Sequence, residues 1–82
     1  MRQGASENVV ISITRAGGTT AVDSQVTITV NGASYVNRRT GPTGILTEAF
    51  NPTSIGNYTF DVEVRAIGYQ NPPNQRFVIA VL

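Results

Sequence analysis

The sequence predicts an all-β fold, an Ig-like antiparallel β-sandwich of six to seven strands. Valine, isoleucine, threonine, tyrosine and phenylalanine are abundant, and several short segments alternate apolar with polar residues. Glycine, proline and asparagine separate these segments at intervals of roughly 8 to 15 residues, which is typical of two packed antiparallel sheets. No stretch has the apolar spacing of an amphipathic helix. A small β-barrel is the less favoured alternative.

Six segments are predicted to form strands. They cover residues 8–14, 25–30, 33–40, 45–50, 57–66 and 75–82. The dipeptide Asn31-Gly32 favours a tight hairpin turn between the second and third segments. The motif GPTG ends the third segment and NPPN precedes the last one, because turn residues and adjacent prolines interrupt a strand ladder. The segment TTAV adds a seventh strand if it pairs.

The longest alternating segment, NYTFDVEVRA, also carries the densest group of charges. Its apolar positions are Tyr58, Phe60, Val62, Val64 and Ala66. These positions must face the core, because a shift of one residue would bury Asp61, Glu63 and Arg65 together. The charged positions are therefore predicted to face solvent. Residues two apart lie side by side on a strand, so Glu63 is expected to pair with Arg65.

Two further predictions concern the chain after this segment. A bulge at Gly68 would change the register and turn Ile67 and Tyr69 toward the core. The last segment, RFVIAVL, is apolar at both parities, which predicts burial on both faces. Alternatively, its second face meets a neighbouring domain.

The length predicts a single domain, since 82 residues supply one modest core. Residues 1–6, MRQGAS, are expected to be a disordered leader or an expression remnant, and residues 7–82 to form the folded unit. The last apolar segment runs to Leu82 with no polar tail, so we expect the domain to be part of a longer protein. Any export signal would then lie outside this chain.

The charge and composition exclude several classes of function. Six arginines and five acids give a net charge of +1, too small a field for binding to nucleic acid or anionic membranes. No apolar run is long enough for membrane insertion. The absence of cysteine excludes disulfides and thiolate metal sites.

Catalysis is not expected, because the chain lacks the necessary groups. A seryl nucleophile needs a base, and there is no histidine or lysine to serve as one. The acids lie on strand surfaces or loops rather than as a buried pair. The motif TGPTG has two glycines but no lysine, so a hairpin turn explains it better than a phosphate loop. We expect neither enzymatic activity nor a cofactor.

Four carboxylates are candidates for a calcium site. Asp61 and Glu63 would bind calcium if Asp23 or Glu48 came near them. The chain lacks a dense run of calcium-binding residues, so a solvated charged face is the preferred interpretation. Separately, Asn57-Tyr58-Thr59 is an N-glycosylation sequon if the protein is secreted by a eukaryote.

A group of polar residues on the third segment is the candidate ligand-binding site. Tyr35, Asn37 and Arg39 share a parity, and Arg38 lies beside them. An exposed tyrosine next to arginine stacks on sugar rings or anchors partner proteins. The preferred interpretation is that Tyr35 packs at the rim of the sheet and the arginines remain solvated.

The motifs VTITVNG, TGPTG and GNYTFDVEVRAIGY together resemble the Ig-like modules of bacterial surface proteins of the invasin and intimin type. They are also similar to the transthyretin-like regulatory domains of carboxypeptidases, in which a T-x-x-x-G turn precedes a G-x-Y-x-x-x-V strand that ends in G-Y. The resemblance covers residues 9–82. It places Gly44 at the turn position, Tyr58 at the core aromatic position, and Gly68 and Tyr69 at the G-Y pair that ends the strand motif.

The resemblance implies an extracellular or cell-surface module, often one of a tandem array, without catalytic residues of its own. Some related modules crosslink themselves through a lysine–asparagine isopeptide bond, which this lysine-free chain cannot form.

Three functions follow as hypotheses. The first is a structural or adhesive module of a microbial surface protein, a spacer or contact surface for neighbouring domains or another surface protein. The second is an accessory carbohydrate-binding module of a secreted enzyme, with polysaccharide held by Tyr35, Arg38 and Arg39. The third is a component that assembles by pairing of edge strands.

Overall fold

The computed structural model describes the whole chain except positions 16 and 19. Within that part there are six strands in two antiparallel sheets and no helix, so the predicted all-β sandwich is confirmed. The strands are β1 (Glu7–Ser12), β2 (Ser24–Val30), β3 (Ala33–Arg39), β4 (Ile45–Phe50), β5 (Gly56–Ala66) and β6 (Gln75–Val81). Among the described residues, no helix is long and apolar enough to cross a membrane.

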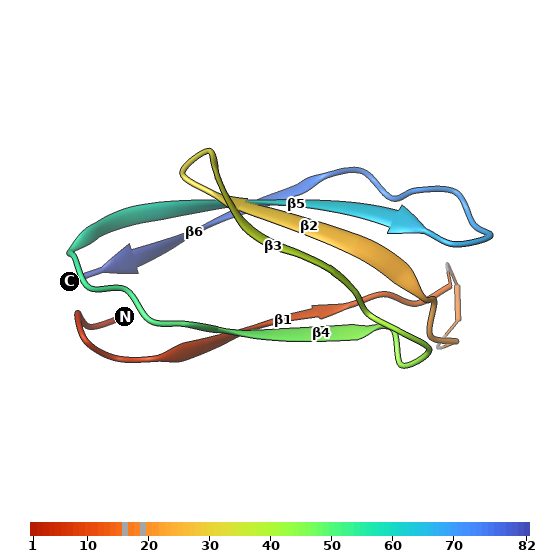
Figure 1. The fold of residues 1–82 in the computed structure, drawn as a ribbon, viewed down its shortest axis with the longest axis horizontal. Coiled ribbons are helices and arrows are strands. Elements are labelled where there is room, and N and C mark those ends of the chain that lie inside the picture. Colours follow the sequence, from red (N-terminus) through yellow and green to blue (C-terminus); the bar gives the residue numbers. More distant parts are fainter. Residues whose placement is uncertain (16, 19) are drawn as a thin grey trace.

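The two sheets differ in size. Four strands pair in the order β3-β2-β5-β6, and the second sheet contains only β1 and β4. Figure 1 shows the larger sheet as one layer and the β1-β4 pair as the other, with the two chain ends at the same end of the molecule. Two strands are too few to cover the inner face of four.

The core lies between these layers. Its buried apolar residues are Val9, Val22, Val26, Ile28, Val36, Leu46, Phe50, Phe60, Val62, Val64 and Val81. Phe60 is fully buried, stacks on Phe77 with ring centroids 4.8 Å apart, and meets the ring of Phe50 edge-on at 5.0 Å. The parity predicted for residues 57–66 is therefore confirmed, because the positions of Phe60, Val62 and Val64 are buried and the charged positions face outward.

The predicted hairpin between β2 and β3 is also confirmed. Asn31 and Gly32 both have positive φ, 51° and 82°, as a two-residue turn with the twist of the flanking strands requires. The side-chain oxygen of Asn31 additionally accepts a hydrogen bond from the backbone N–H of Thr59, at 2.8 Å. The turn is thus tied to β5 as well as to its own strands.

A bulge in β3 corrects the predicted orientation of Tyr35. Ile28 pairs with Val36 but Thr29 pairs with Ser34, so Tyr35 is the extra residue. Its ring packs edge-on against Phe60, with centroids 6.1 Å apart, and lies on the inner side of the sheet. The prediction that Tyr35 shares a face with Asn37 and Arg39 is therefore wrong.

The predicted bulge at Gly68 is wrong as well. Strand β5 ends at Ala66, whose N–H donates to the side-chain oxygen of Asn71 at 2.9 Å. Gly68 lies in the turn that follows, with φ 79°. Ile67 and Tyr69 do not turn into the core, since each is about half exposed, at 49% and 50%.

The last strand is not buried on both faces within this chain. Phe77, Ile79 and Val81 lie on the inner parity, whereas Val78 is 56% exposed on the outer one. Leu82, just after the strand, is 83% exposed. Contact of this outer face with a neighbouring domain remains a prediction.

The first residues of the chain contact the end of β6. The backbone nitrogen of Met1 donates to Ala80 O at 2.7 Å, Leu82 N–H donates to Met1 O at 2.9 Å, and Gln3 N–H donates to Leu82 O at 3.0 Å. These bonds connect the backbone of residues 1–3 to the end of β6, and the expected leader at residues 1–6 stays a prediction.

In the segment TTAV, Ala21 forms an isolated antiparallel bridge with Thr14, and Val22 is buried. Position 19 lies outside the described residues. In the described part of the chain, this segment therefore forms a single isolated bridge and not a seventh strand.

Candidate functional site

An apolar groove of about 960 Å³ lies where the smaller sheet leaves the larger one uncovered. Residues 10–15 of the β1 region form one wall, and residues 69–73 with Phe77 form the other. Val62 and Val64 of β5 contribute to the floor. The groove lies on the β6 side of the larger sheet, next to β1, because β4 lies against the β3 side.

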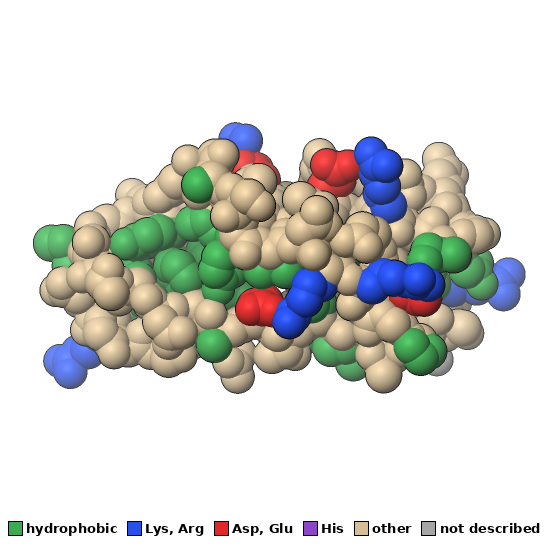
Figure 2. Space-filling model, viewed as in Figure 1, with side chains coloured by type: hydrophobic (Ala, Val, Ile, Leu, Met, Phe, Trp, Pro, Cys, Tyr) green, Lys and Arg blue, Asp and Glu red, His purple; other side chains and the backbone are tan. Residues whose placement is uncertain are grey.

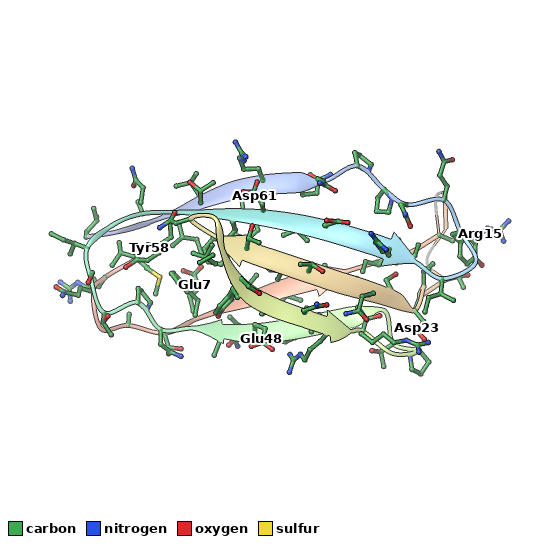
Figure 3. All side chains as sticks on the ribbon, turned by 45° about the horizontal axis from the view of Figure 1, so that its top comes forward. Glu7, Arg15, Asp23, Glu48, Tyr58 and Asp61 are labelled. Atoms are coloured by element: carbon green, nitrogen blue, oxygen red, sulfur yellow. The ribbon has the colours of Figure 1, made fainter. Side chains whose placement is uncertain are left out.

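The described side chains that line the groove are mostly apolar. Among its lining residues, Arg15 carries the only charge and the phenol of Tyr69 is the only other ionisable group. Arg15 lies at the same end of the molecule as the loop after β5 (Figure 3). Among the described residues, the lining includes no carboxylate, imidazole or amine.

Along this groove, none of the described residues pairs with the second backbone edge of β1. Ile13 N–H donates to Gly44 O at 2.8 Å, and Ile13 O accepts from Val22 N–H at 3.0 Å, so the backbone groups of Ile13 point away from the groove. Backbone groups alternate in direction along a strand. Those of Val10, Ser12 and Thr14 therefore point toward the groove, and we call them the open edge of β1.

The candidate ligand-binding residues do not form one surface. Tyr35 and Arg38 reach across from β3 to the edge of β4. The Tyr35 hydroxyl donates to Ala49 O at 2.7 Å, and the Arg38 guanidinium donates to Thr47 O at 3.4 Å while pairing with Glu48. These contacts close the β3–β4 side of the sandwich.

Asn37 and Arg39 point to the outer face of the larger sheet. The side-chain oxygen of Asn37 accepts a hydrogen bond from the amide of Gln25 on β2. Arg39 pairs with Asp23 at 2.6 Å. Asn37 is thus held by a residue of β2, and Arg39 by the residue that immediately precedes β2.

The four candidate calcium ligands are each paired with an arginine. The pairs are Asp23–Arg39 at 2.6 Å, Asp61–Arg76 at 2.7 Å, Glu63–Arg65 at 3.6 Å, and Glu48–Arg38. The predicted Glu63–Arg65 pair is confirmed. Figure 2 shows the acidic side chains of the visible face next to basic ones. The described residues hold no group of three or more acidic, histidine or cysteine side chains that would bind a metal ion.

One of these pairs shifts the pKa of its carboxylate. Arg39 donates two hydrogen bonds to Asp23, at 2.6 and 3.3 Å, and these bonds hold the pKa of Asp23 below its usual value. The same contact raises the pKa of Arg39, and the hydrogen bond to Asp61 likewise raises the pKa of Arg76. Both effects favour the charged pair over neutral partners.

The sequon residue Asn57 is exposed near the start of β5.

Sequence reasoning did not identify the groove, although one signal was present: residues 8–14, NVVISIT, contain no charge and no proline. Comparisons with protein-family models, with curated proteins and with solved structures found no match.

Proposed function

We propose that this chain is a non-catalytic structural or adhesive module that acts through contact with other proteins, as part of an extracellular or cell-surface microbial protein. The observation that carries the proposal is the apolar groove beside the open edge of β1, because exposed apolar surface of this kind is typical of protein contact. The partner would be a neighbouring domain or another surface protein.

The composition of the chain supports a role without turnover. It has no histidine, lysine or cysteine, and the candidate carboxylates are engaged by arginines. The resemblance to bacterial Ig-like surface modules supports the extracellular location. Both arguments favour a module that contacts partners over one that acts on substrates.

The arrangement gives less support to polysaccharide as the ligand. A sugar-binding tyrosine offers its ring face and hydroxyl to the ligand. Here the ring of Tyr35 packs on Phe50 and Phe60, and its hydroxyl is bonded to Ala49. We therefore prefer protein contact.

The proposal can be tested with the dye anilinonaphthalene sulfonate, which fluoresces on accessible apolar surface. The folded protein should bind the dye saturably, and Tyr69→Ser should weaken binding severalfold, because Tyr69 lines the groove. Tyr35→Phe, on the β3–β4 side, is the matched control and should leave dye binding unchanged. Dye binding that is absent, or indifferent to Tyr69→Ser, would contradict the proposal.

Thermal melts with a panel of soluble polysaccharides form the second part of the test. A ligand at 100 times its Kd adds about 2.7 kcal/mol, and 1 kcal/mol raises the Tm of so small a domain by roughly 4 to 8 °C. We expect flat melts. A saturating rise above about 10 °C with one sugar, lost in Tyr35→Ala, would replace protein contact by carbohydrate binding.

A further inference from the structure

We propose that the groove accepts one extended β-strand from a partner polypeptide, which adds to the open edge of β1 and completes the smaller sheet. This inference rests on the proposed function in protein contact and specifies its chemistry. The occupant is a segment of about six or seven residues that alternates apolar with polar side chains and carries an acidic group near Arg15.

Burial along β1 indicates where a strand is missing. Val9, opposite the covered part of the larger sheet, is 6% exposed. Ile11 and Ile13 share its inner parity but remain only half-buried, and both line the groove. Phe77 on the facing wall is also half-buried. The inner side chains of a further strand would cover all three.

The edges of β3 and β4 carry features that discourage pairing, and on β6 such features lie at the two ends of the strand. The edge of β3 carries a bulge at Tyr35 and two arginines, features that natural proteins use to discourage pairing. On β4, the carbonyls of Thr47 and Ala49 are capped by side chains from β3.

On β6, residues 1–3 pair with the end of the strand, and Pro72-Pro73 precede its start. In contrast, residues 8–14 of the β1 region contain no charge, proline or bulge. Their free N–H and C=O groups lie beside an apolar groove, which is the combination that strand addition requires.

The polarity of the groove defines the partner further. Arg15 is the only charged side chain in its lining, and none of the described ion pairs includes it. An acidic residue at the corresponding end of the added strand would pair with it, and a basic one would be repelled.

The geometry favours a single strand over a second copy of this chain. Pairing β1 with β1 of another copy about a two-fold axis would bring the second copy's larger sheet across the first, because each larger sheet extends past β1 on the β6 side. An isolated extended segment avoids this overlap.

The test uses residues 1–82 and a synthetic probe, an acetylated and amidated octapeptide of alternating threonine and valine ending in two aspartates. Amide hydrogen exchange is followed by NMR with and without the peptide. At saturation, exchange at Val10, Ser12 and Thr14 should slow by about tenfold or more. Ile13 and the other amides that already point toward β4 should slow less than these three, since strand addition gives a new hydrogen bond only to alternate residues.

Two variants and a second peptide make the test specific. Ser12→Pro removes an edge donor and obstructs the edge, so it should abolish protection, whereas Ser12→Thr keeps the amide and should bind normally. If Ser12→Pro unfolds, Tyr69→Ser replaces it and should weaken binding severalfold. The same peptide ending in two lysines should bind more weakly than the aspartate form to the unmodified protein.

Three results would overturn the inference. They are no protection at millimolar peptide, protection that does not alternate along β1, and protection in the absence of peptide that rises with protein concentration. The third would identify a second copy as the occupant. Any of them, with dye binding in the groove intact, would leave protein contact standing and exclude only the added strand.

Discussion

At the scale of single residues, the surface charges are arranged as local pairs. Arginine is the only basic side chain, and four of the six arginines pair with a carboxylate. These pairs are solvent-exposed, so they contribute little to stability and instead keep the outer faces polar. In the Asp23–Arg39 pair, the guanidinium donates two hydrogen bonds, one to each carboxylate oxygen.

The Asp23–Arg39 pair predicts a pH dependence of stability. The pKa of Asp23 is lower in the folded chain than its ordinary value of about 3.9, so the unfolded state binds the proton more tightly. The stabilisation from this group is therefore present above about pH 4 and is lost as the pH falls through the folded pKa. Denaturant unfolding of the native chain and of Asp23→Asn should show a difference at pH 7 that shrinks toward pH 2.

Arg39→Gln serves as the control for that measurement. It removes the largest cause of the lowered pKa, so the pH dependence attributable to Asp23 should become smaller in this variant. A difference between the native chain and Asp23→Asn that is constant from pH 7 to pH 2 would contradict the assignment.

At the scale of elements, alternation in the sequence located every strand to within about two residues, because each strand has one buried face. It did not predict the inward turn of Tyr35. That turn depends on a bulge and on the rings of Phe50 and Phe60, which come from two other strands. The sequence of one segment does not show its contacts with distant strands. Predicting side-chain orientation from alternation therefore fails where residues of other strands form the packing site.

The turn before β4 provides a prediction about how elements meet. Gly44 has φ 66°, and a Cβ at this position would lie 2.6 Å from Ile13 O and 3.1 Å from Val22 N. Gly41, in the same turn, has φ 73° but no heavy atom within 4 Å of the corresponding position. Alanine at either site meets the left-handed backbone cost of about 1 kcal/mol, but only Gly44→Ala also forces the turn away from β1.

Gly44→Ala should therefore lower the free energy of unfolding by about 3 kcal/mol, and Gly41→Ala by about 1 kcal/mol. Urea unfolding of the two variants beside the native chain measures both values. Equal losses would mean that β4 and β1 are not packed as closely as the contact at Ile13 requires.

At the scale of the whole molecule, the groove results from the unequal size of the two sheets, which no single segment of the sequence reveals. Residues 8–14 were identified as a strand, but whether its edge is free depends on strand order. Strand order is set by packing between distant segments, such as the contacts of Tyr35 and Arg38 with β4. The fold class was therefore predictable, whereas the groove was not.

The same mismatch predicts uneven stability across the molecule. β2 and β5 each have a strand on both sides, so their amides should exchange with solvent only when the whole domain unfolds. The β1-β4 pair is held to the larger sheet mainly by side chains, and it can separate while the four-stranded ladder stays intact. Native-state hydrogen exchange should show amides of the β1-β4 ladder, including Ile13, exchanging about tenfold faster than those of Val26, Ile28 and Val62.

Measuring amide exchange with and without the octapeptide then tests whether this difference in stability between the two sheets depends on the uncovered groove. A partner that adds a third strand covers Ile11 and Phe77 and should raise the protection of the β1-β4 pair toward that of β2 and β5. Uniform exchange in the isolated protein would mean that the two sheets open as one cooperative unit. In that case the uncovered inner face would not make the smaller sheet less stable than the larger one. Binding at the open edge would then not reduce any difference in protection between the two sheets.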